Sequence, residues 1–197
     1  MPLPSRAPRI PHVPEGLGLG RVAYAAARQH RDILLSLLRN LRRAQNRIWL
    51  ATPYFVPDRG LRKQLALAAR RGVDVRILTT EKTDSTPAQW AARAIYGELL
   101  EHGVRIFEYT PRLMHSKVLL VDDVWGSIGT ANFDYRSLFI NYELTLISTN
   151  EALNGQLRNE FVTDLLDASE ITGIAWKHRG FIKAVYDTLG LLLRKWL

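Results

Sequence analysis

The chain has 197 residues and no cysteine, which excludes a disulfide framework and a thiolate metal site. Its hydrophobic content of 47% is enough for one domain with a normal core, and its formal charge of +8 favours anionic partners such as nucleic acid, anionic lipid headgroups or substrates that carry phosphate. Since cysteine, an apolar leader and a long apolar run are all missing, we expect a cytoplasmic protein, soluble or peripheral to a membrane.

The first segment, residues 1–24, holds five prolines and three glycines, which predicts an arm or linker. A catalytic domain is expected over residues 25–170. It begins with an amphipathic helix, because apolar residues recur every three or four positions between Arg28 and Arg47. The outer face of this helix is strongly basic, and a solvated surface is the preferred interpretation of that charge.

Strands and helices alternate after this helix. Buried strands are predicted at residues 47–55, 73–80 and 104–109. Helices are predicted between them, from a cap at Asp58 through Arg71, with Gly72 at the C-terminal end, and from Thr86 to Gly103. Further strand-like runs at residues 117–121, 124–129 and 139–148 follow in quick succession, which favours antiparallel pairs. We therefore expect an α/β fold whose mixed, partly parallel sheet is sandwiched between helices.

A last helix is predicted from Glu151 to about Ala168, followed by an amphipathic tail over residues 171–197. The tail combines many apolar residues with Lys183, Arg194 and Lys195. This composition suits a helix that lies on an anionic membrane, and packing on the domain or in a dimer contact is an equal alternative.

The chemically informative stretch runs from Met114 to Glu143. Side chains alternate along a strand, so a strand that carries His115 and Lys117 places both on one face. An imidazole serves as a nucleophile or as a general acid and base near neutral pH, whereas an ammonium group supplies charge to an anion. A phosphoryl group would use both side chains.

Four further residues complete this predicted site. The Glu143 carboxylate could bond one imidazole nitrogen and so fix the tautomer of the histidine. Asn132 follows a tight Gly-Thr-Ala turn and offers an amide N–H to a phosphoryl oxygen, and Thr130 adds a hydroxyl. Asp122 has the opposite strand parity, so we expect it to pin the turn or Lys117 without touching substrate.

Tyr54 and Phe55 stand at the end of a predicted strand and are candidates for a substrate pocket, although aromatic core residues are the commoner explanation. Asp84 and Asp134 are interpreted as loop acids. No cluster of metal ligands is visible in the sequence, so neither a metal nor a cofactor is expected.

The run HSKVLLVD at residues 115–122 resembles the HxKxxxxD motif of the phospholipase D superfamily. Asn132, the last residue of the later GTAN, and Glu143 match the family at offsets of 17 and 28 residues from His115. The stretches TPYFVPD, ARRGVDVRIL and GVRIFEYTP look like the C-terminal half of bacterial cardiolipin synthases. The resemblance implies a metal-free, two-step phosphodiester exchange through a phosphohistidine. It also implies catalytic roles for His115, Lys117, Asp122 and Glu143, and phosphate binding by Lys117, Asn132 and Thr130.

Two-motif enzymes of this superfamily use two histidines, and this chain has one motif. The resemblance implies that a second motif comes from a symmetric homodimer, as in single-motif nucleases, or from a chain that carries the N-terminal half. A third possibility is that the sequence is a piece of a longer enzyme. The role of His115 stays open between nucleophile and general acid and base.

The preferred hypothesis is a cardiolipin-synthase-like phosphatidyltransferase or phosphodiesterase. It would act on a phospholipid like phosphatidylglycerol at the anionic inner face of the cell membrane. The main alternative is a homodimeric nuclease that acts on DNA or RNA phosphodiesters, where the basic charge would follow the nucleic acid backbone. A third hypothesis is a non-catalytic half-site that binds anionic lipid.

Overall fold

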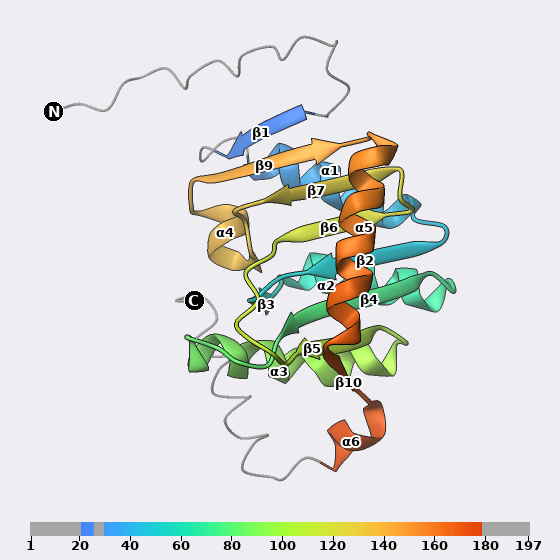
Figure 1. Ribbon diagram of the computed structural model, residues 1–197, viewed down its shortest axis with the longest axis vertical. Coiled ribbons are helices and arrows are strands. Elements are labelled where there is room, and N and C mark those ends of the chain that lie inside the picture. The colour runs from blue at the N-terminus through green and yellow to red at the C-terminus, as the bar shows by residue number, and fades with distance from the viewer. Residues whose placement is uncertain (1–20, 26–29, 179–197) are drawn as a thin grey trace, which may run out of the picture.

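A mixed sheet of eight strands forms the centre of the computed structural model, which describes residues 21–25 and 30–178. The strand order is β1-β9-β7-β6-β2-β4-β5-β10 (Figure 1). The pairs β2–β4 and β4–β5 are parallel, and the other neighbours in this sheet are antiparallel. The mixed, partly parallel sheet that the sequence predicts is thus confirmed.

The elements have the following bounds. The large sheet consists of β1 (Arg21–Ala25), β2 (Arg47–Ala51), β4 (Asp74–Thr80), β5 (Arg105–Tyr109), β6 (Val118–Val121), β7 (Trp125–Gly129), β9 (Glu143–Ser148) and β10 (Ala168–Ile171). A small parallel sheet pairs β3 (Phe55–Val56) with β8 (Phe133–Asp134). The helices are α1 (His30–Arg43), α2 (Arg59–Arg70), α3 (Thr86–Glu101), α4 (Tyr135–Phe139), α5 (Glu151–Leu166) and α6 (Gly173–Lys177).

Helices cover both faces of the large sheet. Helix α5 crosses one face, and α1, α2 and α3 lie behind the other (Figure 1). The residues of β2 alternate between the two layers: Ile48 and Leu50 are fully buried in the larger core cluster, with residues of α1, α2 and α3, whereas Trp49 stacks on Phe161 of α5 with ring centroids 5.2 Å apart. The predicted sandwich is therefore present.

One edge of the sheet collects the chain segments that carry the predicted site. The parallel strands β2, β4 and β5 all end at this edge. Strand β6 is antiparallel to β2 and pairs Val118 with Ala51, so β6 begins at this edge. The next two antiparallel neighbours follow from this register: β7 ends at the same edge, and β9 begins at it. Ligands of open α/β sheets bind at the carboxyl ends of parallel strands, so the topology brings the site residues to a favourable position.

The signals at the ends of α2 act as the sequence predicts. The Asp58 carboxylate accepts hydrogen bonds from the backbone N–H groups of Gly60 and Leu61, both at 3.0 Å. Gly72 follows the helix with φ +89°, in the left-handed region. This part of the prediction is confirmed.

The structure differs from the predicted element order at five places. The strand predicted over residues 47–55 ends at Ala51, and Phe55 begins the separate strand β3. Strand β1 lies in the predicted arm and pairs with β9, and β10 crosses the predicted boundary at residues 170 and 171 to pair with β5. The strand predicted over residues 139–148 is wrong in its first part, because α4 occupies Tyr135–Phe139 and β9 begins at Glu143. Helix α6 stands in the predicted tail. Residues 1–20 and 179–197, including Lys183, Arg194 and Lys195, lie outside the described residues.

Within residues 21–25 and 30–178, no helix combines the length and the apolar character that a membrane span requires.

Candidate active site

His115 lies in an irregular segment just before β6, at the edge where β2, β4 and β5 end. The preceding residue fixes this segment, because Met114 is 5% exposed in the core and its N–H donates to the Thr80 hydroxyl at 3.3 Å. His115 itself is exposed, and its ring has no hydrogen-bond partner among the described residues. The imidazole is therefore available at the surface from a well-anchored backbone.

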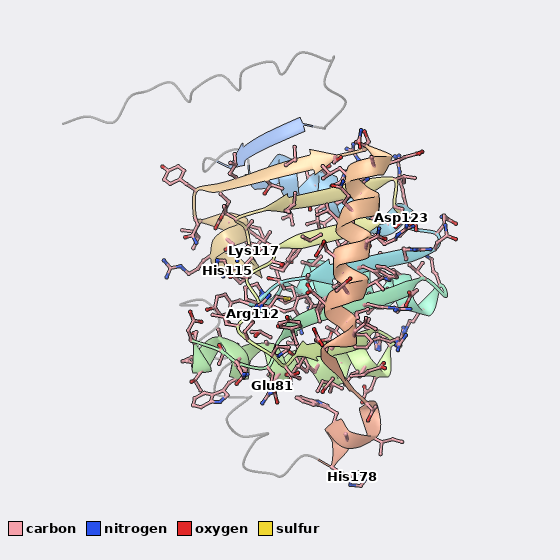
Figure 2. The ribbon with its side chains drawn as sticks, viewed as in Figure 1. Glu81, Arg112, His115, Lys117, Asp123 and His178 are labelled. Atoms are coloured by element: carbon pink, nitrogen blue, oxygen red, sulfur yellow. The ribbon has the colours of Figure 1, made fainter. Side chains whose placement is uncertain are left out.

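Lys117 follows at the entrance to β6 and is buried, with 8% of its surface exposed. Its Nζ donates a hydrogen bond to the carbonyl oxygen of His115 at 2.9 Å. Burial lowers the pKa of the ammonium group, and the nearby charges of Glu143 and Asp134 act in the opposite direction. Figure 2 shows His115 and Lys117 together at the same edge of the sheet.

The prediction that a strand carries both residues is wrong, because β6 starts only at Val118. The pairing of β6 with β2 ends at Ala51, where β2 itself ends, so nothing extends the ladder to His115. The two side chains nevertheless reach the same edge, because the hydrogen bond from the Lys117 ammonium holds it against the His115 backbone.

The Gly-Thr-Ala-Asn turn is held between β6 and β9. The N–H of Gly129 donates to the Lys117 carbonyl at 3.2 Å, and the N–H of Thr130 donates to the Leu144 carbonyl at 2.9 Å. Asn132 is half-buried, and its Oδ1 has no hydrogen-bond partner among the described residues. The hydrogen bonds of Gly129 and Thr130 thus fix the turn that carries the Asn132 amide, a group that can donate to a phosphoryl oxygen.

Glu143 is buried at the start of β9, with 8% of its surface exposed. Its carboxylate accepts a hydrogen bond from the Thr130 hydroxyl, which in turn accepts the N–H of Leu144 at 3.0 Å. The predicted bond between Glu143 and His115 is not formed, because Thr130 occupies the carboxylate and the imidazole points to solvent. Thr130 thus binds the acid of the site, and the hydroxyl that was predicted to face phosphate already has two partners.

Asp134 belongs to this site and was wrongly interpreted as a loop acid. It is 7% exposed, stands in β8, and its carboxylate accepts the backbone N–H of Ser137 at 2.7 Å as the cap of α4. Burial raises the pKa of the Asp134 carboxyl, and the charge of Glu143 raises it further against the effect of the Ser137 hydrogen bonds. The sequence signal was the helix cap, three residues before Ser137.

Asp122 lies at the opposite end of β6 from Lys117, a separation of about 16 Å along an extended strand. Its carboxylate accepts three backbone N–H groups, from Gln45, Asn46 and Arg47, each at 2.8 Å. Figure 2 shows the neighbouring Asp123 at the far side of the sheet from His115 and Lys117. Asp122 therefore organises the turn into β2, and it contacts neither Lys117 nor the candidate site.

Alanine at position 122 is expected to destabilise the fold by about 2 kcal/mol, because three N–H groups lose their acceptor. The backbone here has φ 52°, a left-handed conformation that Asn tolerates, and Asn also keeps one acceptor oxygen. Chemical denaturation should therefore give Asp122→Asn a larger free energy of unfolding than Asp122→Ala. Equal stability of Asp122→Ala and the unmodified protein would contradict this role.

The two aromatic pocket candidates have different places. Phe55 has no exposed surface and packs in the core, so the predicted substrate contact is wrong for this residue. Tyr54 is half-buried near the site and its hydroxyl donates to the Asp84 carboxylate. Burial, with the Asp84 hydrogen bond, raises the pKa of Tyr54 to about 12, which keeps the phenol protonated as a donor.

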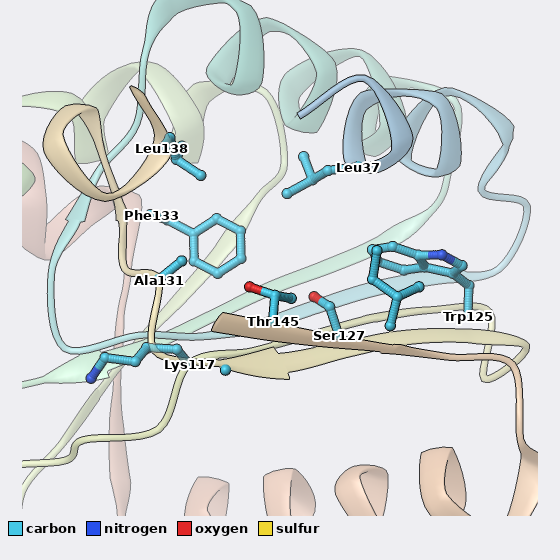
Figure 3. Close-up of a pocket in the computed structure, with 10 residues that line it drawn as sticks. Leu37, Lys117, Trp125, Ser127, Ala131, Phe133, Leu138 and Thr145 are labelled. Carbon is cyan, nitrogen blue, oxygen red and sulfur yellow. The ribbon is translucent and has the colours of Figure 1, made fainter. Parts of the chain in front are cut away.

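A small cavity lies behind Lys117, between the sheet, α1 and α4. Figure 3 shows the lysine stem at its side with the ammonium group at the outer end, and the hydroxyls of Ser127 and Thr145 directed inward. The cavity offers about 30 Å³ to the centre of a water molecule, which is room for water but not for a phospholipid headgroup. Substrate would therefore meet His115 at the surface.

Comparison with known proteins agrees with the motif. The family model described as "Cardiolipin synthase, PLD-like domain" matches residues 37–165, which is more than half of the chain. A cardiolipin synthase from Geobacillus thermodenitrificans is 39% identical over 150 residues, which covers 76% of this chain and 30% of that relative. The chain thus spans under a third of the length of the curated relatives it matches.

Solved structures share the fold. Nuc, a phospholipase D family member from Salmonella typhimurium, matches with a TM-score of 0.65 and 22% identity, over 77% of this chain and 97% of that chain. A phosphatidylserine synthase from Haemophilus influenzae matches with a TM-score of 0.68 and 14% identity, over 89% of this chain and 44% of that chain. The shared fold therefore covers nearly all of the Nuc chain and less than half of the phosphatidylserine synthase chain. Because the family match runs from α1 through α5 and includes every candidate site residue, the chain belongs to the family of phospholipase D-like domains of cardiolipin synthases.

Proposed function

We propose that this chain supplies one of the two catalytic halves of a phosphatidyltransferase that acts on the phosphodiester of a phospholipid such as phosphatidylglycerol. The observation that carries the proposal is the exposed His115 imidazole, without a described partner, on a residue whose backbone carbonyl binds the ammonium group of the buried Lys117. The family match to cardiolipin synthases supports a phospholipid as substrate.

The site residues divide the chemistry between them. The Lys117 charge offsets the negative charge of the phosphoryl oxygens, and the Asn132 amide adds a hydrogen bond. As a nucleophile, a His115 nitrogen would bond to phosphorus while the alcohol leaves with a proton from another group. As the acid and base, His115 would give that proton and later accept one from the incoming alcohol. In either role, His115 would work with a second histidine.

The second motif would come from outside this chain segment, through a second copy, a chain with the N-terminal half, or another part of a longer protein. The open position of His115 supports this part of the proposal. The cavity beside Lys117 is too small for substrate, so a facing surface is needed to enclose the headgroup and exclude water.

The function is tested by incubating the purified chain with phosphatidylglycerol vesicles and with plasmid DNA in parallel. Each arm is run alone and with a chain that carries the N-terminal half of a cardiolipin synthase. We expect cardiolipin and glycerol in the lipid arm and intact plasmid in the DNA arm. Cleaved DNA with unchanged lipid would support the nuclease alternative, and no turnover in any arm would leave the half-site that only binds anionic lipid.

The basic surface supports binding to an anionic membrane. Residues 33–73 span most of α1 and all of α2 and carry nine Arg and Lys residues but one acid, Asp58. The net charge of this segment is therefore as large as the +8 of the whole chain. On α1, Arg39, Arg42 and Arg43 are exposed and form no ion pair with a described carboxylate. A groove between them is lined by Leu35 and Leu38. Arginines around an exposed and a half-buried leucine suit a charged lipid interface.

Replacing all three arginines of this groove, Arg39, Arg42 and Arg43, by Gln is expected to weaken binding to vesicles that contain phosphatidylglycerol by about a hundredfold, since each basic residue near such a surface contributes about 1 kcal/mol. Co-sedimentation at low and high salt measures the loss. A matched control removes the same charge elsewhere, with Gln at Lys82, Arg105 and Arg158. Equal losses for the two triple variants would show that overall charge, and not this face, binds the membrane.

A further inference from the structure

Three charged side chains are buried together at the candidate site. Lys117, Asp134 and Glu143 are each 7–8% exposed, although charged residues are rarely buried without a partner. A fourth buried acid, Glu108, shows the usual solution, because Arg93 binds it through hydrogen bonds of 3.0 and 3.1 Å. The three site residues form no such bidentate pair within the part of the chain that the structure describes, where they make up a cluster of one cation and two acids.

The position of Asp134 in this cluster is fixed from two directions. Strand β8 places it opposite Val56 of β3, and the hydrogen bond from Ser137 holds one carboxylate oxygen at the start of α4. Phe133, the residue before Asp134 in β8, lines the same small cavity as Lys117, so the Asp134 backbone lies close to that lysine. At this position the negative charge of Asp134 favours the charged form of Lys117. Among the described residues, the charged groups that act on Lys117 are Asp134 from β8 and Glu143 from β9, and the His115 backbone accepts its hydrogen bond.

The helix cap alone does not explain an acid at position 134. Asn and Ser cap helices about as well as Asp, and a neutral side chain would avoid the cost of burying a second carboxylate beside Glu143. Glu143 already shares its carboxylate with Thr130. Lys117 loses hydration through burial, so a second negative charge has a clear effect at this position: it favours the charged form of the lysine.

We propose that Asp134 is a positioning residue, whose carboxylate acts with that of Glu143 to keep the Lys117 ammonium group charged and directed at the mouth of the site. The proposal rests on the proposed function, in which this ammonium group binds the phosphoryl oxygens. Asp134 itself touches no substrate, and its effect passes through Lys117.

The test is a pH titration of Lys117 in the full chain. The titration is monitored by NMR of protein whose lysines carry carbon-13 at Cε, and the Lys117 signal is assigned as the one that is lost in Lys117→Arg. Asp134→Asn keeps the cap and removes the charge, so the Lys117 midpoint should move to lower pH than in the unmodified protein. Asp58→Asn is the matched control, because it neutralises the cap of α2 in the same way and lies outside the cluster. The control should leave the Lys117 midpoint unchanged.

Asp134→Ser, which also caps a helix without charge, repeats the test if Asp134→Asn does not fold. A Lys117 midpoint in these variants equal to that of Asp58→Asn would overturn the proposal. In the phospholipid assay, the loss of activity at high pH should begin at lower pH in Asp134→Asn than in Asp58→Asn. The NMR titration needs no turnover, so an inactive protein with a shifted Lys117 midpoint would refute the proposed function and still support the role of Asp134.

Discussion

Alanine in place of His115 should reduce turnover of phospholipid by about 1,000-fold or more, because either role of the imidazole, nucleophile or acid and base, is then lost. The free energy of unfolding should change by less than about 0.5 kcal/mol, since His115 is exposed and its ring has no described partner. Initial rates of product formation and chemical denaturation measure the two effects separately.

The control for this substitution is His178→Ala, since His178 is also exposed and follows α6, far from His115 (Figure 2). It should leave the rate unchanged. Turnover that survives in His115→Ala would remove this residue from the mechanism. A rate lost together with the fold would mean that the exposed imidazole has a structural role that its surroundings do not indicate.

The elements that depend on local signals could be predicted from the sequence. Helix α2 is bounded by Asp58 and Gly72, and each of these residues acts on the backbone within a few positions of itself. Strands β1, β3, β8 and β10 could not be found in this way. They are two to five residues long, and each exists because a distant segment completes its ladder, such as β9 for β1 and β5 for β10.

The site shows the same division. The spacing of His115 and Lys117 was enough to predict that they meet, because they are two residues apart. The place of Asp134 depends on the pairing of β8 with β3, whose residues lie almost eighty positions earlier in the chain. The partner of Glu143 was mistaken for a related reason. The alternation of side chains along β9 predicts the face of the sheet on which the Glu143 side chain lies. The group that bonds its carboxylate depends on the path of the turn after β7, which places Thr130 next to β9.

Gly129 joins the fold to the site, because it ends β7 and begins the turn that carries Thr130 and Asn132. A Cβ at this position would lie 2.2 Å from the carbonyl oxygen of Leu144 and 2.8 Å from the Cα of Thr145, both in the backbone of β9. Real Cβ atoms do not come this close to backbone, and a strand in the middle of a sheet cannot rotate away as a side chain can. Strands β7 and β9 would have to separate locally.

Gly129→Ala should therefore lower the free energy of unfolding by about 3 kcal/mol, at the upper end of the range for overpacked positions. Separation of the strands would also break the hydrogen bond from Thr130 N–H to the Leu144 carbonyl and release the Thr130 hydroxyl from Glu143. Turnover should then fall even at temperatures where the variant stays folded. The control is Gly155→Ala in α5, where a Cβ meets no atom within 4 Å and alanine should stabilise the helix by up to about 1 kcal/mol. If chemical denaturation gave both alanine variants the same stability, the close approach of β7 and β9 would not be what holds the Gly-Thr-Ala-Asn turn over Glu143.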